Sequence, residues 1–208
     1  MSLIQLIMSV MLALTPAKAR PNENSAQMAT YQAIAQGINA AVDAPIVELP
    51  FDGPAAKEAS AIALASIAKN ESDFRQEVRD CHIKGDNGRS ISVFQLIRGP
   101  GRLKYSEKDI CLDDGLAAKL SLNVLTWYKR EWSLKSLFQG YATGSPYLKS
   151  QGATNQHAYF TNQLAANKIR LFRKPGFSKF YAESTEPVVT SSDDGGTIQT
   201  RTASLTSR

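Results

Sequence analysis

The chain has 208 residues, of which 43% are hydrophobic and 21% charged, enough for one globular domain with a core and tails. Its net charge of +5 favours anionic partners such as cell wall, nucleic acid or a membrane surface. The sequence has no dense run of Lys and Arg and no nucleic-acid-binding motif, which argues against nucleic acid.

Residues 1–19 resemble a secretory signal peptide. Leu3–Leu14 form an apolar stretch that is too short to span a bilayer as a mature helix, and Ala17 and Ala19 fit the small-residue cleavage rule. Cleavage would leave Arg20 as the mature terminus of a periplasmic or secreted protein. The segment lacks the usual Lys or Arg before the apolar stretch, and the alternative is an uncleaved amphipathic or core helix.

Residues 20–53 are interpreted as an N-terminal extension and linker. Helical potential lies around Gln27–Val42, and the prolines and glycine of Ala44–Pro54 indicate a loop. The domain proper is expected at 54–176. The Ser- and Thr-rich stretch at 177–208 is expected to be a disordered tail, because it offers too little apolar surface to bury.

The expected domain is mostly α-helical. An apolar stripe through Leu116, Leu120, Val124 and Trp127 predicts that Trp127 is buried, and Gly140 is expected to stop a helix. The predicted helices are Ala55–Asn70, Leu116–Trp132, Ser133–Gln139 and Asn155–Arg173. The last of them ends in a basic cluster. Ile83–Gly101 is expected to be loop or short strand.

The two cysteines, Cys81 and Cys111, are too few for a zinc site, even with His82 nearby. In an oxidising compartment they could form a disulfide, worth roughly 3–4 kcal/mol in the chain-entropy model. In a reducing cytosol they would be buried free thiols. His82 and His157 belong to no nucleophile or metal motif.

Glu71 is the residue with the clearest chemical potential. Leu64, Ile67 and Ala68 precede it by seven, four and three residues, so all four side chains share the apolar face of one helix. Burial on that face raises the pKa of a carboxyl group, as a glycosidase acid requires. A Glu at a helix end is more often a solvated charge, so the case depends on the segment that follows.

That segment resembles soluble lytic transglycosylases and goose-type lysozymes. The family has a helix ending in Glu-Ser, a loop of the form G-D-x-G-x-x-x-G-x-x-Q, and a later Y-N-x-G-like turn. The corresponding residues here are Glu71-Ser72, Gly85–Leu96 and Tyr141–Gly144, in the same order, within roughly residues 55–172. The sequence departs from the pattern at Ser92, where the loop has a glycine, and at Ala142, in place of Asn.

The resemblance implies an α+β lysozyme-like fold and cleavage of peptidoglycan glycan strands without metal or cofactor. It implies that Glu71 is the general acid and then base, that Ser72 orients it, and that Gln95 bonds the sugar. Tyr141 would line the cleft and could position the carboxyl.

Asp86 is a possible second carboxylate. In goose-type lysozymes the Asp of the G-D unit is suited to orient a water, but Gly-Asp-Asn-Gly is also strong turn chemistry, and we favour the turn role. A lytic transglycosylase is therefore expected, with lysozyme as the alternative. The third reading is a non-catalytic wall-binding or virion structural protein. A secretion system or a phage particle could be the setting.

Overall fold

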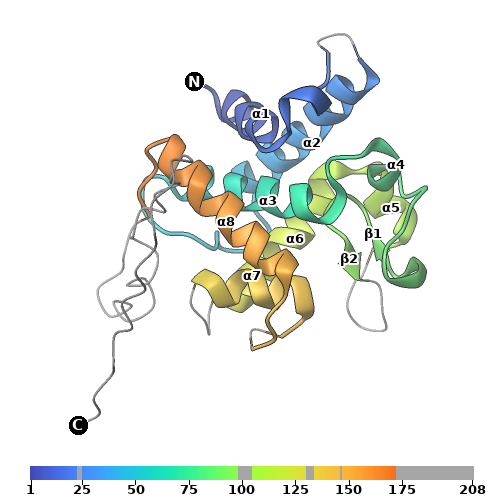
Figure 1. The fold of residues 1–208 in the computed structure, drawn as a ribbon. Helices are drawn as coiled ribbons and strands as arrows, with labels where there is room; N and C mark the ends of the chain where they lie inside the picture. The colour runs from blue at the N-terminus through green and yellow to red at the C-terminus, as the bar shows by residue number, and fades with distance from the viewer. Residues whose placement is uncertain (23–24, 98–104, 130–133, 146, 172–208) are drawn as a thin grey trace, which may run out of the picture.

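A computed structural model describes residues 1–22, 25–97, 105–129, 134–145 and 147–171. Over these residues the fold is mostly helical, as predicted, with one small two-stranded sheet (Figure 1). The elements in chain order are α1 (Leu3–Leu14), η1 (Ala17–Ala19), α2 (Ala26–Asp43), α3 (Ala56–Ser72), α4 (Gln76–Arg79), η2 (Asp86–Gly88), β1 (Ser90–Ile91), β2 (Leu96–Ile97), α5 (Glu107–Leu112), α6 (Asp114–Lys129), α7 (Leu134–Thr143) and α8 (Gln151–Ala166). The expected tail at 177–208 lies outside the described residues.

Helix α3 lies at the centre of the fold and contacts α1, α2, α6 and α8 (Figure 1). Every residue from Ala59 to Ala68 is buried, so this helix is covered on all sides. Its many Ala and Ser side chains are short enough to let several helices approach it at once, and Ala favours the helical conformation intrinsically. The prediction of this helix from its composition is confirmed.

Helix α1 is part of the same hydrophobic core. Ser2 caps its first turn in a capping box with Gln5, and one face of the helix is buried through Leu6, Ile7, Val10 and Met11. It packs against α2 and α3. This packing supports the uncleaved core helix, the alternative to a signal peptide, and the core shows no break at residue 54, where the domain was expected to begin.

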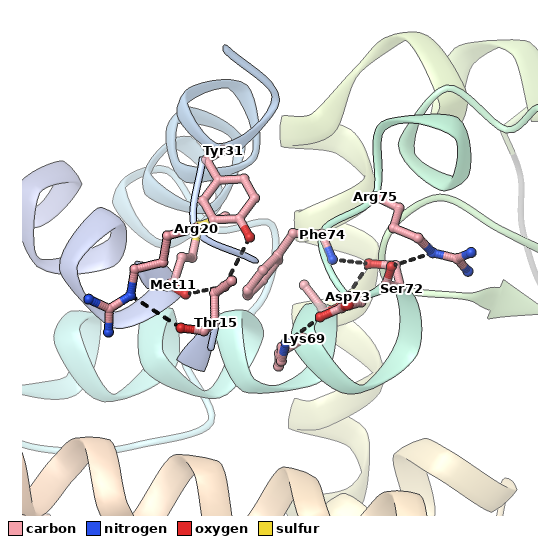
Figure 2. A network of polar contacts seen from close by, with 10 residues as sticks. Met11, Thr15, Arg20, Tyr31, Lys69, Ser72, Asp73, Phe74 and Arg75 are labelled. Atoms are coloured by element: carbon pink, nitrogen blue, oxygen red, sulfur yellow. Dashed lines mark hydrogen bonds and ion pairs between the residues drawn. The ribbon is translucent and has the colours of Figure 1, made fainter. Parts of the chain in front are cut away.

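A chain of contacts connects α1 to the end of α3, as Figure 2 shows. The Thr15 hydroxyl contacts the Tyr31 hydroxyl of α2 at 2.9 Å, and Arg20 donates to the Thr15 carbonyl at 3.2 Å. The Tyr31 ring meets Phe74 edge-on, with ring centroids 5.2 Å apart. Phe74 lies just beyond the end of α3, so α1 and α2 support the turn that ends this helix.

Helix α6 is present as predicted, but its buried face differs from the predicted stripe. Trp127 is 58% exposed, so its predicted burial is wrong, whereas its neighbour Tyr128 is buried. The buried face instead includes the small residues Ala117, Ala118 and Ser121. Of the predicted stripe only Leu120 is buried, whereas Leu122 and Leu125, which lie outside the stripe, are completely buried.

Gly140 does not stop α7, which continues to Thr143. A Cβ at Gly140 would lie 2.3 Å from the Tyr128 ring, so the glycine permits α6 and α7 to approach closely. Helix α8 begins at Gln151, after the Ser150 cap, and ends at Ala166, earlier than predicted. Lys168, which has a φ of 56°, therefore follows the helix instead of lying in its last turn.

Residues 73–97 form an irregular region that includes most of the loop or short strand expected at Ile83–Gly101, of which 98–101 lie outside the described residues. Strands β1 and β2 are antiparallel, with Ser90 opposite Ile97 and Ile91 opposite Leu96. The short helices α4 and α5 were not predicted. Cys81, after α4, forms a disulfide with Cys111 of α5, and their Cα atoms are 5.7 Å apart. Arg79 of α4 donates to both carboxylate oxygens of Asp114 in α6. These bonds tie the irregular region to the helical body.

Among the described residues, none of the helices combines the length and hydropathy needed to cross a membrane.

The packing of α1 predicts a difference between two isoleucines on the same helix. Ile7 is 1% exposed and Ile4 is 38% exposed. Ile7→Ala should lower the free energy of unfolding by about 2–4 kcal/mol, because it leaves a cavity in the core, and Ile4→Ala by about 1 kcal/mol or less. Urea unfolding of the full chain measures both values, and equal small losses would show that α1 does not belong to the stable core.

Candidate functional site

Glu71 occupies the last turn of the central helix. Helix α3 ends at Ser72, and the chain then turns away through Asp73 and Phe74, which have φ values of 54° and 56°. A bulky aromatic residue rarely adopts this conformation, which costs about 1–3 kcal/mol. Burial of Phe74 against Tyr31 holds it there. The sharp ending leaves Glu71 partly exposed beside a buried helix face.

Two side-chain amides hold the Glu71 carboxyl group. Gln156 Nε2 of α8 donates to Glu71 Oε1 at 2.5 Å, and Asn70 Nδ2 donates to the same oxygen at 3.3 Å. Burial raises the pKa of Glu71, and the nearby charge of Asp86 raises it further, while the Asn70 and Gln156 hydrogen bonds act in the opposite direction. The prediction that burial on an apolar face raises the pKa of Glu71 therefore agrees with the structure.

Asp86 and Tyr141 also interact with Glu71 through their charges. Asp86 is exposed in the η2 turn, and its carboxylate accepts a hydrogen bond from the Ser90 hydroxyl at 2.5 Å. Burial is the main reason that the pKa of Tyr141 lies above its usual range, and the charge of Glu71 adds to the effect. The structure thus brings Glu71, Asp86 and Tyr141 into one region from three separate elements.

The roles implied for Ser72 and Tyr141 differ from their contacts. Ser72 is buried, donates to the Ala68 carbonyl at 2.7 Å and accepts from the Phe74 N–H at 3.2 Å, so it ends the helix and makes no hydrogen bond to Glu71. The Tyr141 hydroxyl donates to the Phe94 carbonyl at 2.7 Å, which fixes the loop. Neither side chain orients the carboxyl by direct contact.

The predicted loop does place Gln95 next to the Gly-Asp unit. A Cβ at Gly85 would lie 2.1 Å from Gln95 Oε1, so only glycine leaves room for this amide. Gln95 Nε2 donates to the Ser92 carbonyl at 3.0 Å. Ser92 itself has a φ of 63°, in the left-handed region that favours glycine, and its hydroxyl accepts from the Phe94 N–H at 3.3 Å. Serine thus adopts this conformation here.

Backbone strain concentrates around this region. Among the described residues, those other than glycine with positive φ are Asp73, Phe74, Cys81, Asp86, Asn87, Ser92, Gln95 and Lys168, and only the last lies far from Glu71 in the sequence. Such conformations persist only where the surroundings impose them, and they cluster at functional sites. All of these residues except Lys168 thus fall in the segment 73–95, which follows Glu71 directly.

Sequence reasoning missed Gln156. It lies on α8, 85 residues after Glu71, and is completely buried. Gln in a helix usually lies at the surface, and no motif marked it. The one available signal was its place within α8 between buried Ala153 and Phe160, at helical spacing on the face that meets α3.

A groove of about 780 Å³ lies elsewhere, between α1 and α2. Its lining is mixed and includes Ile4, Met8, Leu12, Arg20 and Gln36. None of the predicted site residues contributes to it, so its size is no guide to the chemistry near Glu71. The cleft expected beside Glu71 stays a prediction.

Within the described ranges, no group of three or more His, Cys, Asp and Glu side chains could hold a metal ion.

Comparisons with protein-family models, with curated proteins and with solved structures found no match to this chain.

The environment of Glu71 predicts how stability depends on pH. The raised pKa means that the folded state binds the proton more tightly than the unfolded state, whose value is near 4.5. The contribution of Glu71 to stability is therefore fully present below the unfolded pKa and is lost as pH rises through the folded pKa. The Glu71→Gln variant should therefore become more stable than wild type, in free energy of unfolding, as pH rises from the unfolded to the folded pKa of Glu71. In stronger acid the variant should show no such gain.

Urea unfolding at a series of pH values measures this difference. Glu77→Gln is the matched control, because Glu77 is an exposed carboxyl in the neighbouring helix α4. If the free energy of unfolding of Glu71→Gln stays parallel to that of wild type at all pH values, the burial of the carboxyl group is contradicted.

Proposed function

We propose that this protein is a lysozyme-like enzyme that cleaves the glycan strands of bacterial peptidoglycan, with Glu71 as general acid and then base. The observation that carries the proposal is the Glu71 carboxyl at the end of a buried helix, held by Gln156 and with a raised pKa. A raised pKa favours the protonated form of the carboxyl group, which an acid catalyst of glycoside cleavage requires. The family resemblance around Glu71, the Gly85–Gln95 loop and Tyr141 supplies the substrate class.

The bond cleaved would be the β-1,4 link between N-acetylmuramic acid and N-acetylglucosamine. Protonated Glu71 donates its proton to the leaving oxygen as the glycosidic bond breaks. The sugar's N-acetyl group and local dipoles stabilise the positive charge at the anomeric carbon. Ionised Glu71 then takes the proton from the sugar's own 6-hydroxyl, whose oxygen bonds to the anomeric carbon. The product is a 1,6-anhydro end, and the acid is restored without any cofactor.

The contacts of Asp86 support this reaction over hydrolysis. A hydrolase that inverts the anomeric centre needs a second carboxylate, roughly 6.5–9.5 Å from the acid, to activate water. The Asp86 carboxylate accepts from Ser90, and its backbone has a φ of 48° within the η2 turn, so structural constraints account for this residue. Lysozyme activity, with Asp86 as base, is the second candidate.

A non-catalytic wall-binding or virion structural protein of the same fold is the rival from another class. It would keep the fold and bind glycan without turnover. The departures at Ser92 and Ala142 were its main support, and the accommodation of Ser92 in the left-handed conformation weakens that support. Ala142 lies in α7 next to Tyr141 and provides no polar group for a sugar.

The products of digestion separate these candidates. Purified peptidoglycan treated with the protein should give fragments that end in 1,6-anhydro-muramyl residues, each lighter by one water than a hydrolysed end. Mass spectrometry of the early digest measures the ratio of the two ends. Reducing ends from the start would identify a lysozyme and promote Asp86 to the water-activating base. Well-folded protein that releases no fragment would favour the binding or structural protein.

We place the site of action at the wall, in the periplasm or outside the cell, or on a phage particle that must breach the wall. The Cys81–Cys111 disulfide supports an oxidising compartment. The mildly basic charge suits an anionic wall. A secretion-system or phage-particle assembly is a further possible partner, for which the described residues give no specific contact.

The packing of α1 predicts the terminus of the active protein. Because Leu6, Ile7, Val10 and Met11 are buried in the core, protein that degrades the wall should retain residues 1–19. Retention would favour the phage-particle setting over export with signal cleavage. Intact-mass measurement of active material isolated from its native compartment checks this. A terminus at Arg20 in fully active protein would restore the signal-peptide interpretation and would show that α1 is dispensable.

A further inference from the structure

Gln156 has a feature that its hydrogen bond to Glu71 does not explain. Its Nε2 donates to Glu71, but its Oε1 is buried and has no hydrogen-bond partner, and it is the only such side-chain atom among the described residues. Buried polar atoms are almost always paired, so an unpaired one calls for an explanation. The residue is 0% exposed, which leaves solvent no access to that oxygen in the structure.

The two ends of an amide have nearly the same size and shape, so rotation about the last side-chain bond exchanges them without extra space. With Nε2 toward Glu71, the amide donates to an ionised carboxylate. With Oε1 toward Glu71, it accepts the hydrogen of a protonated carboxyl. The Oε1 orientation fits only the protonated carboxyl, because against a carboxylate it would place two acceptors face to face. The Nε2 orientation is the one that an ionised carboxylate requires.

We propose that Gln156 is the positioning residue for Glu71 and that its amide reverses when Glu71 gains or loses its proton. The carboxyl group then keeps one strong hydrogen bond, and one location, in both halves of an acid–base cycle. The unpaired Oε1 is the acceptor that the protonated state uses. This inference rests on the proposed role of Glu71 and deepens it.

The other groups around Glu71 do not provide this exchange. Asp86, from the η2 turn, is an acceptor held by Ser90, and Tyr141, from α7, donates to the Phe94 carbonyl. Asn70 lies at 3.3 Å from the same Glu71 oxygen and is a weaker donor. Lys69, the nearest cation in the sequence, pairs with Asp73. His157 follows Gln156 on α8, but its ring meets Phe138.

The wild-type protein allows a test that needs no turnover. In full-length protein labelled with ¹³C and ¹⁵N, NMR follows the Glu71 carboxyl carbon and the Gln156 Nε2 and Cδ with pH. The Gln156 signals should shift with the same midpoint as Glu71. Gln156 signals that stay constant while Glu71 titrates would overturn the proposal, whether or not the protein cleaves peptidoglycan.

Variants test the consequence for catalysis. Gln156→Met keeps the length of the side chain but removes its donor and acceptor, and it should lower the lytic rate at least about 10-fold and raise the titration midpoint of Glu71. Gln163→Met is the matched control, two turns later on α8, and should change neither value. A Gln156→Met protein with wild-type rate and midpoint would contradict the positioning role.

In Gln156→Glu, the new side chain can act as both hydrogen-bond donor and acceptor only while its carboxyl group is protonated. Its activity should survive in acid and disappear toward neutral pH, where two carboxylates would face each other, so the pH of maximal rate should fall. A merely structural role would lower the rate equally at every pH, and that result would overturn the proposal. This variant also provides the answer if Gln156→Met does not fold. If wild-type protein releases no fragments while Gln156 still titrates with Glu71, the proposed function fails and the amide exchange stands.

Discussion

The candidate site depends on one constraint, which is that the Glu71 carboxyl group is held against the buried face of the central helix α3. Glu71 can occupy that place because α3 ends one residue later and because Gln156 reaches its carboxyl from α8. Burial disfavours the charged form of the group, and the amide offsets part of that cost. The two effects act on the pKa of Glu71 in opposite directions, and burial is the larger of them.

Elements far from Glu71 in the sequence maintain this position. The contacts from Thr15 to Tyr31 to Phe74 brace the strained turn just after α3, so α1 contributes to the geometry near the site (Figure 2). On the other side, the Cys81–Cys111 disulfide and the Arg79–Asp114 pair anchor the irregular region. The backbone strain of residues 73–95 is tolerated because these bonds act from several directions.

The sequence predicted those features that depend on local chemistry. An uninterrupted Ala-rich run defined α3, and glycines and short polar residues defined the loop that holds Gln95. Features that depend on packing were missed or misplaced. Trp127 was assigned to the core because it continues the apolar stripe of Leu116, Leu120 and Val124, but it is exposed. Gly140 was taken as a stop, although it makes room for the Tyr128 ring. Gln156 could not be found, because only the fold brings it to Glu71.

The central claim is that the Glu71 carboxyl performs the chemistry, and the rate of wall cleavage by Glu71→Gln tests it most directly. This variant replaces the acid by an amide of the same shape, which can still accept the Gln156 hydrogen bond, so the fold should persist. Release of soluble fragments from purified peptidoglycan should fall at least about 100-fold, the low end for loss of a general acid. Fragment release at the wild-type rate by folded Glu71→Gln protein would contradict the account.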